Sequence, residues 1–238
     1  MNCKNCNNEL SLNFCSNCGQ PSKIKRIDSH YIIHEIEHVL HFERGILYTV
    51  KELVTKPGQC VKEFITENRA RLVKPIIFII ITSLIYSIIN HFFHIEEEYA
   101  KEYPITGTTT ISIFKWMQSH YGYANIIQGS FIAVWLRLFF RKYAYNFFEI
   151  LILLCFVMGI GMLISAFFLL VQGLTHFDLL LIANILGIAY CSWAIGQFFD
   201  KTKPSNYLKA FISYMLGILT SGIFLVLIGT LIDLLIKH

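Results

Sequence analysis

The sequence contains few charged residues. Asp, Glu, Lys and Arg make up only 15% of its 238 residues, whereas 55% are hydrophobic, and the mean hydropathy is +0.53. Soluble domains usually carry about 25% charged residues, so this composition excludes an ordinary soluble protein and indicates a helical membrane protein. The net charge of +4 is also too small to favour nucleic-acid binding, and we expect none.

Motifs of the common enzyme classes are missing as well. The sequence has no glycine-rich loop that could cradle a phosphate, no nucleophile elbow and no recognisable Ser/His/Asp arrangement. Its long apolar runs carry no series of acidic residues, which a proton-driven pump would need, and no repeat that would indicate an inverted-repeat transporter. These absences favour a protein that is not an enzyme.

Four cysteines lie close together at the start of the chain. They form two CxxC pairs, Cys3 with Cys6 and Cys15 with Cys18, and this spacing lets four thiolates surround one zinc ion tetrahedrally. Residues 1–22 are therefore predicted to be a small zinc ribbon. The alternative is a disulfide pair in an exported peptide, but nothing before Cys3 resembles a secretory signal, and reduced thiols favour the cytosol. Because four protein ligands leave no open position, the zinc is expected to be structural.

Residues 23–74 are predicted to form cytosolic amphipathic helices next to the membrane. Apolar residues recur at helical spacing over 28–56, Gly45 is expected to bend or break this helix, and Pro57-Gly58 is expected to end it in a sharp turn. A second short amphipathic helix is predicted over 59–68. Both segments are too polar to span a bilayer, so they either lie in the membrane interface or pack on the membrane domain.

A metal-binding motif lies inside the first of these segments. His34, Glu35 and His38 match HExxH, which on a helix places two imidazoles one turn apart and a carboxylate beside a metal-bound water. The segment is rich in His and Glu, however, and its histidines project away from the apolar stripe. A solvated helix face is therefore favoured over a catalytic zinc site.

Residues 75–238 hold long apolar runs and are predicted to form a helical membrane domain. About five transmembrane helices are expected, and the segment 94–122 between the first two is expected to be a loop. The predicted spans are about residues 75–93, 123–140, 147–171, 177–199 and 207–232. The second is short, so it either spans the membrane or is re-entrant.

The distribution of charge predicts an orientation. Arg69, Arg71 and Lys74 precede the first span and acidic residues follow it, while the basic pair 141–142 marks the inner side again. This pattern places the N-terminus in the cytosol and the C-terminus outside. Arg69, Arg71 and Lys74 are also expected to bind anionic lipid headgroups.

Polar residues at the span ends are further candidates. Glu149 stands near the start of the third span, close in sequence to Arg137 and Arg141, and is either a functional group at membrane depth or part of a structural ion pair. Four histidines on the predicted outer side could form a metal or proton site, or could be ordinary surface residues: His91, His94, His120 and His176.

Small residues recur at helical spacing within the spans and allow helices to approach closely. The pairs are Gly161/Ser165, Ala183/Gly187, Ser192/Gly196 and Gly217/Ser221. They are interpreted as packing residues of one bundle, with the face of a homo-oligomer as the alternative. The scattered Cys60, Cys155 and Cys191 are interpreted as packing residues too.

The order of motifs resembles a known family. The motifs that carry the resemblance are Cys3-Lys4-Asn5-Cys6, Phe14–Gln20, His34-Glu35, His41–Gly45, Tyr48–Leu53, Lys56-Pro57-Gly58, Glu63-Phe64-Ile65 and Asn68–Pro75. They resemble a bacterial domain-of-unknown-function family, numbered thirty-six sixty-seven, of multi-pass membrane proteins with an N-terminal zinc ribbon. The resemblance covers residues 1–90 and implies a ribbon, interfacial helices and a membrane bundle in the cytoplasmic (inner) membrane of a bacterium, but it implies no established activity.

Three functions follow from these observations. The favoured one is a membrane scaffold or adaptor whose zinc-stabilised head binds a protein partner or lipid headgroups. The alternatives are a transporter or channel component with a regulatory zinc ribbon, and a membrane metallohydrolase that uses His34, Glu35 and His38. The sequence identifies no ligand or partner.

Overall fold

The computed structural model describes residues 45–69, 71–95 and 109–236, together with residues 6, 9, 16 and 17. The predicted zinc ligands other than Cys6, and the HExxH segment 34–38, therefore lie outside the described residues. Residues from Arg44 onward belong to one compact unit, and the fold below is that of this unit.

Within residues 45–236, the regular elements that the structure describes are all helices, which confirms the predicted all-α class. They are α2 (Ile46–Thr55), α3 (Pro57–Thr66), α4 (Pro75–Phe93), α6 (Thr109–Ser119), α7 (Tyr121–Phe139), the short 3-10 helix η2 (Arg141–Tyr143), α8 (Phe147–Thr175), α9 (Leu180–Asp200) and α10 (Pro204–Ile236).

The two amphipathic helices begin and end at residues with special backbone geometry. Gly45 adopts φ 61° directly before α2, which suits glycine and agrees with the predicted break there. The predicted turn at Pro57-Gly58 is wrong, because the chain breaks at Lys56, between α2 and α3. Pro57 opens α3 instead, in the first turn, where its missing N–H leaves no helical hydrogen bond unmade.

Four described helices are long and apolar enough to cross a membrane: α4, α8, α9 and α10. They correspond to four of the five predicted spans, and the first matches residue for residue. The predicted second span does form a helix, α7, but α7 is not among the four. Its interior polar residues Asn125, Gln128 and Arg137 lower its hydropathy, so the prediction of a fifth apolar span is corrected on this point.

The segment before α7 also differs from the prediction. Residues 109–119, expected to be part of a loop, form α6. The backbone N–H of Thr109 donates to both carboxylate oxygens of Asp233, at 3.0 and 3.2 Å, and the Thr109 hydroxyl donates to the same group. A carboxylate is favourable at a helix N-terminus, so a residue 124 positions away supports α6 in a way that a local pattern does not reveal.

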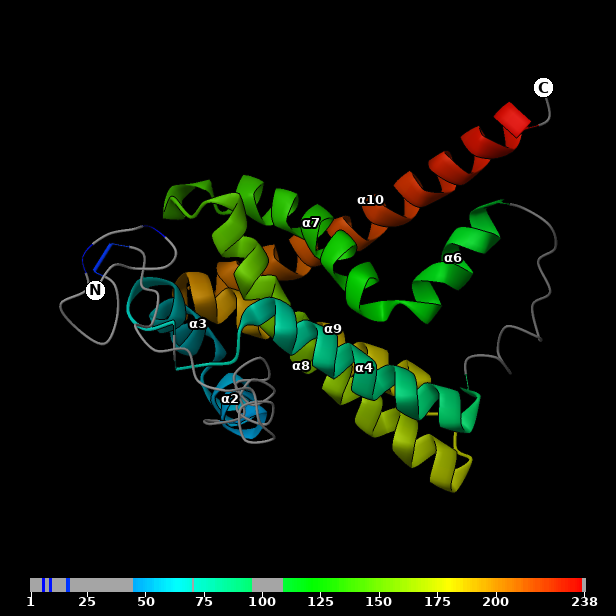
Figure 1. The fold of residues 1–238 in the computed structure, drawn as a ribbon, viewed down its shortest axis with the longest axis horizontal. Helices are drawn as coiled ribbons and strands as arrows, with labels where there is room; N and C mark the ends of the chain where they lie inside the picture. The colour runs from blue at the N-terminus through cyan, green and yellow to red at the C-terminus, as the bar shows by residue number, and fades with distance from the viewer. Residues whose placement is uncertain are drawn as a thin grey trace. The chain divides into compact units, whose positions relative to one another are not determined.

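The connections between the long helices gather at two ends of the bundle (Figure 1). At one end, Tyr145 packs on Phe198 with ring centroids 4.7 Å apart, and Asn206 donates to the Tyr143 hydroxyl at 2.9 Å. At the other end, Tyr86 of α4 packs edge-on against Tyr121 of α7. Helix α7 therefore runs from one end to the other, alongside α4, α8 and α10.

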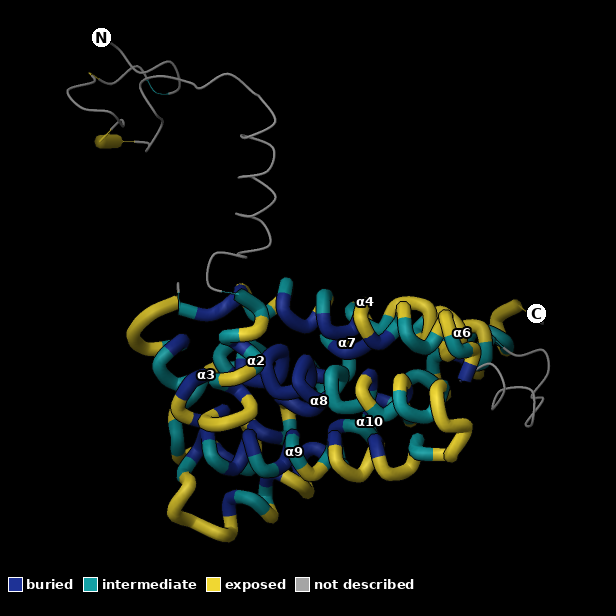
Figure 2. The backbone as a smooth tube through the Cα atoms, turned by 90° about the horizontal axis from the view of Figure 1, so that it is seen from below, coloured by how far each residue is buried: buried dark blue, intermediate teal, exposed yellow. Residues whose placement is uncertain are grey.

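Helices α2 and α3 pack on the first of these ends. Leu53 and Val61 are fully buried, and the ring of Phe64 meets Phe156 of α8 edge-on at 5.2 Å. The Tyr190 hydroxyl of α9 donates to the Leu53 carbonyl at 2.9 Å. Figure 2 shows the buried residues concentrated around α8 and beneath this pair, whereas α6 and the distal half of α10 are largely exposed or half-buried. Of the two predicted placements, the described part of the amphipathic region adopts packing on the membrane domain.

Candidate functional site

The structure does not assemble a metal site from the predicted histidines. The described residues contain no group of three or more His, Cys, Asp or Glu side chains that could hold a metal ion. His91 and His94 lie near each other, with ring centroids 5.5 Å apart, but His120 stacks on Trp116 and His176 caps the C-terminal end of α8. The zinc ligands and the HExxH motif are not part of this result, because they lie outside the described residues.

Glu149 has a local structural role. Its carboxylate accepts the Asn146 N–H at 2.8 Å, and its own N–H donates to the Asn146 side chain at 2.9 Å. This reciprocal pair is a capping box that begins α8. The described contacts contain no ion pair between Glu149 and the neighbouring basic residues. The structure thus gives Glu149 a helix-capping role instead of the expected ion pair.

Arg71 joins α2, α3 and the segment that leads into α4. Its Nε donates to the Tyr48 hydroxyl at 2.8 Å, Nη1 to Glu63 at 2.5 Å and Nη2 to Glu52 at 3.1 Å. Next to it, the Val73 N–H donates to the buried Thr49 hydroxyl at 3.2 Å. The rigid fork of a guanidinium suits such a multiple contact. We refer to Tyr48, Glu52, Glu63 and Arg71 as the Arg71 network.

This network changes the interpretation of the basic residues before the first span. Arg71 was expected to face headgroups, but its guanidinium is engaged by two carboxylates of the protein. Arg69 and Lys74 are exposed, and they remain candidates for headgroup contacts. The main effect of Arg71 is to hold the amphipathic pair on the bundle.

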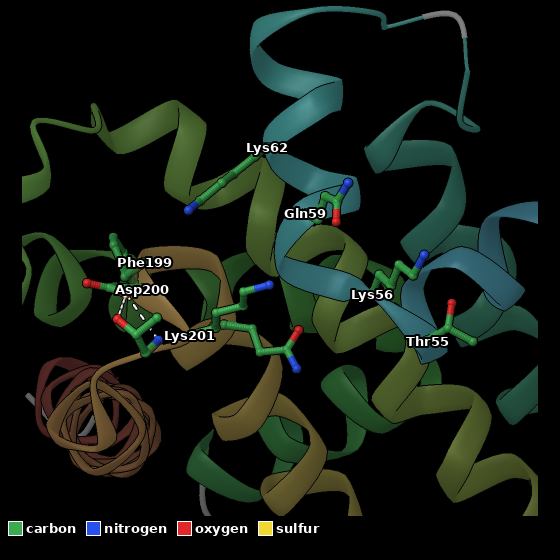
Figure 3. Close-up of a pocket in the computed structure, with 9 residues that line it drawn as sticks. Thr55, Lys56, Gln59, Lys62, Phe199, Asp200 and Lys201 are labelled. Atoms are coloured by element: carbon green, nitrogen blue, oxygen red, sulfur yellow. Dashed lines mark hydrogen bonds between the residues drawn. The ribbon is translucent and has the colours of Figure 1, made fainter.

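A pocket of about 590 Å³ lies where α2 and α3 meet the end of α9. We call it the basic pocket. It is lined by Thr55, Lys56, Gln59, Lys62, Gln197, Phe199, Asp200, Lys201 and Thr202. Figure 3 shows Lys56 and Lys62, from one segment, and Lys201, from the other, among the residues that line this pocket. Two segments about 140 residues apart in the chain thus build one positively charged site.

The one acidic residue that lines the pocket, Asp200, already accepts hydrogen bonds from neighbouring residues. The Asp200 carboxylate accepts from Lys203 Nζ at 2.7 Å and from the Thr202 hydroxyl and N–H at 2.6 and 3.1 Å. Among the described residues, Lys56, Lys62 and Lys201 form no ion pair. Lys62 lies 5.9 Å from the Phe198 ring centroid, where the ring face attracts its charge. The pocket therefore keeps an excess of positive charge.

The chemistry of the lining suits binding of an anion. Ammonium groups, amides and hydroxyls are donors for phosphate oxygens, and the volume is in the range of small-molecule sites. The lining residues include no histidine or cysteine that would act as a base or nucleophile. Sequence reasoning missed this site, because Lys56 and Lys62 looked like the solvated face of an amphipathic helix. Their spacing with Gln59 on one helical face was the available signal.

The comparisons with known proteins connect this site to one family. Residues 43–87 match the family model described as "Protein of unknown function (DUF3667)", which confirms the predicted resemblance. The matched segment contains α2, α3 and the first part of α4, and so includes the whole Arg71 network and four lining residues of the basic pocket, Thr55, Lys56, Gln59 and Lys62. No curated protein and no solved structure matches the chain.

Proposed function

We propose that this protein is a multi-pass membrane scaffold whose basic pocket binds the phosphate group of an anionic lipid headgroup. The observation that carries the proposal is that three lysines, Lys56, Lys62 and Lys201, line one pocket and form no ion pair among the described residues. A scaffold needs a fixed binding surface at the membrane. The hydrogen-bond donors that line this pocket provide such a surface.

The position of the pocket supports a lipid ligand. Its lining includes Asp200, the last residue of the apolar helix α9, and α10 begins only a few residues later at Pro204. The ends of membrane-spanning helices lie at headgroup level, where each Lys near an anionic surface contributes about 1 kcal/mol of attraction. The exposed Arg69 and Lys74 flank the first span at the same end of the bundle and would add to this attraction.

The same charges support the proposed orientation. Lys and Arg gather on the cytoplasmic side of membrane proteins, so we assign this end of the bundle to the cytosol, in an inner membrane. The start of α2 and the end of α10 lie at opposite ends of the bundle, which agrees with a cytosolic N-terminus and an external C-terminus (Figure 1).

The zinc ribbon completes the proposal as its partner-binding part. The spacing of Cys3, Cys6, Cys15 and Cys18 supports one structural zinc, and a ribbon of this size folds only with its metal. We assign protein recognition to this head and membrane recognition to the basic pocket. The Arg71 network supports the membrane-recognition part of this division, because it ties α2 and α3, which line the basic pocket, to the segment that leads into α4.

The test measures binding of soluble lipids to the full chain in neutral detergent. Dihexanoyl phosphatidylglycerol should bind, and dihexanoyl phosphatidylcholine, whose choline cancels the phosphate charge, should bind much more weakly. Lys62→Gln/Lys201→Gln should weaken the anionic lipid about 30-fold, from two contributions of about 1 kcal/mol each. The matched control Lys51→Gln/Lys142→Gln removes the same charge at exposed sites that do not line the pocket.

The outcomes separate the proposal from its competitors. Equal weakening in the two double variants would mean that only net charge matters, and the pocket would lose its role. Inorganic phosphate binding as tightly as the anionic lipid would indicate a soluble anion as the ligand instead.

A further inference from the structure

The membrane bundle contains a second, separate cavity, of about 210 Å³, between α7, α8, α9 and α10. Its polar lining residues come from all four helices: Asn125 and Gln128, Ser165, Asn184 and Cys191, and Tyr214. The remaining lining is Met158, Gly161, Met162, Gly187, Ile188 and Ile218. We call it the bundle cavity. It shares no lining residue with the basic pocket.

The amide groups of this cavity are incompletely satisfied by the protein. Asn125 is 8% exposed and donates to the Ser83 hydroxyl of α4 at 3.1 Å. The side chains of Gln128 and Asn184 form no hydrogen bond with any described residue. In a bilayer no lipid tail can satisfy an amide, so such groups need water, a ligand or a protein partner. A polar molecule in this cavity would supply the hydrogen bonds that these side chains lack.

Two glycines keep the space open. A Cβ added at Gly187 would meet nothing within 4 Å, and one at Gly161 would meet only the Cys191 sulfur, at 3.4 Å. At Gly217 of α10, in contrast, a Cβ would lie 2.6 Å from the Cα of Ile132, so that glycine permits close helix packing. The predicted packing role therefore fits Gly217, whereas Gly161 and Gly187 border a cavity.

The cavity can be reached from the end of the bundle that carries α6. Asn184 is exposed and lies about 6 Å from the start of α9, counting 1.5 Å per residue, whereas the buried Cys191 lies about 16 Å in. Asn184 thus marks the mouth of the cavity and Cys191 its deep part.

We propose that the bundle cavity binds a small uncharged solute that carries hydroxyl or amide groups. No Asp, Glu, Lys, Arg or His lines it, so it offers nothing to pair with an ion. Amides and hydroxyls provide donors and acceptors, while methionine and isoleucine side chains cover a carbon skeleton. The volume corresponds to about seven water molecules at about 30 Å³ each, which suits a solute the size of a short polyol.

The first test asks whether the cavity is hydrated, with two native cysteines as reporters in the full chain in nanodiscs. Cys191 (1% exposed) lines the cavity, whereas Cys155 (4% exposed) is in the same bundle and does not. Methyl methanethiosulfonate reacts with thiolates, which form in contact with water, so we expect labelling at Cys191 to be about tenfold faster than at Cys155. Equal rates would mean a dry cavity and would overturn the proposal.

The second test asks whether the cavity binds the proposed class of solute, with glycerol as the probe. At twice its dissociation constant, glycerol should slow labelling of Cys191 about threefold and leave Cys155 unchanged. Sucrose, which is larger than the cavity, controls for viscosity and should slow neither. Slowing of both cysteines, or none at Cys191 at any glycerol concentration, would overturn the proposal.

Variants identify the binding groups. Asn184→Leu, at an exposed position where folding is not at risk, should remove protection by glycerol. Ser130→Ala on α7, whose hydroxyl donates to Ile126 of the same helix, should retain it. Gly187→Val should fill the cavity and abolish the fast labelling of Cys191, while unchanged labelling of Cys155 reports an intact fold. Full protection in Asn184→Leu would contradict the assignment.

Discussion

Arg71 Nε donates to the hydroxyl of Tyr48, 23 residues earlier in the chain, at 2.8 Å. The contact links the segment before the first membrane helix to the first turn of α2. Glu52 of α2 and Glu63 of α3 bind the same guanidinium. The family match covers all four residues. This arrangement leads to direct predictions about how the amphipathic pair stays on the bundle.

Replacing Arg71 by Gln should loosen α2 and α3 from the bundle. The change leaves Glu52 and Glu63 without their shared partner, and because the Arg71 side chain is 39% exposed, we expect a smaller loss of stability than for a fully buried pair. Hydrogen exchange should rise in residues 46–66 and remain unchanged in α8. Arg69→Gln, at an exposed neighbour, is the control, and an equal effect of both variants would contradict a specific role for Arg71.

A methyl group at Gly58 should clash with α9 and so disturb the packing of α3 on the bundle. A Cβ there would lie 2.6 Å from the backbone N of Phe198, and a backbone atom cannot move aside as a side chain can. Gly58→Ala should therefore destabilise the protein by about 1–3 kcal/mol, measured as a lower Tm in detergent. Gly222→Ala is the matched control, because nothing lies within 4 Å of its added Cβ. A Tm unchanged in both variants would contradict the close approach of α3 and α9.

Cys60 provides a pH-dependent reporter of α3. Burial, and secondarily the nearby Glu52, raises the pKa of its thiol from 9.0 to about 12. Below pH 9 the thiol is protonated in both the folded and the unfolded chain, so the full stability of the fold is retained there. As the pH rises from 9 toward 12, the thiol ionises first in the unfolded chain, and the folded state loses stability. Alkylation of Cys60 by iodoacetamide should therefore stay slow at pH 8 to 10, and should accelerate in Arg71→Gln.

A cysteine introduced by Thr66→Cys, at an exposed position of α3, supplies the reference rate for this experiment. If Cys60 in the unmodified protein reacts as fast as this reference at pH 8, α3 does not pack as described.

Zinc content tests the proposed ribbon. Elemental analysis of the detergent-purified chain should find one zinc ion, and Cys15→Ser/Cys18→Ser should remove it, because the ribbon has four protein ligands and no substitute for them. A second zinc ion that survives in this variant would instead support metal binding by His34 and His38 and would make hydrolysis the next activity to assay.

The sequence predicted those parts of the fold that depend on local patterns. The first span begins at Pro75 as expected, because proline suits the first helical turn and an uninterrupted apolar run follows it. The break at Gly45 was predictable for a similar reason, since a positive φ favours glycine. Hydropathy likewise located α8, α9 and α10 within a few residues of their bounds.

Features that depend on distant residues were not predictable. Helix α6 is supported by Asp233, and the charge of Arg71 is used inside the protein, although its position beside a span suggested lipid contact. The basic pocket is lined by Lys62 and Lys201 from two distant segments, and no local pattern relates these two residues. In α7, the polar residues Asn125 and Gln128 lower the mean hydropathy of the helix, and the same two residues line the bundle cavity. The low hydropathy of α7 and the polar lining of the cavity therefore have the same origin.

The central claim, that the basic pocket holds an anionic lipid, is tested most directly by native mass spectrometry of the full chain extracted in mild detergent. The account predicts one retained phospholipid with an anionic headgroup, lost in Lys62→Gln/Lys201→Gln and kept in Lys51→Gln/Lys142→Gln. Retention of the same lipid in both double variants, or of zwitterionic lipid alone in the unmodified protein, would contradict it.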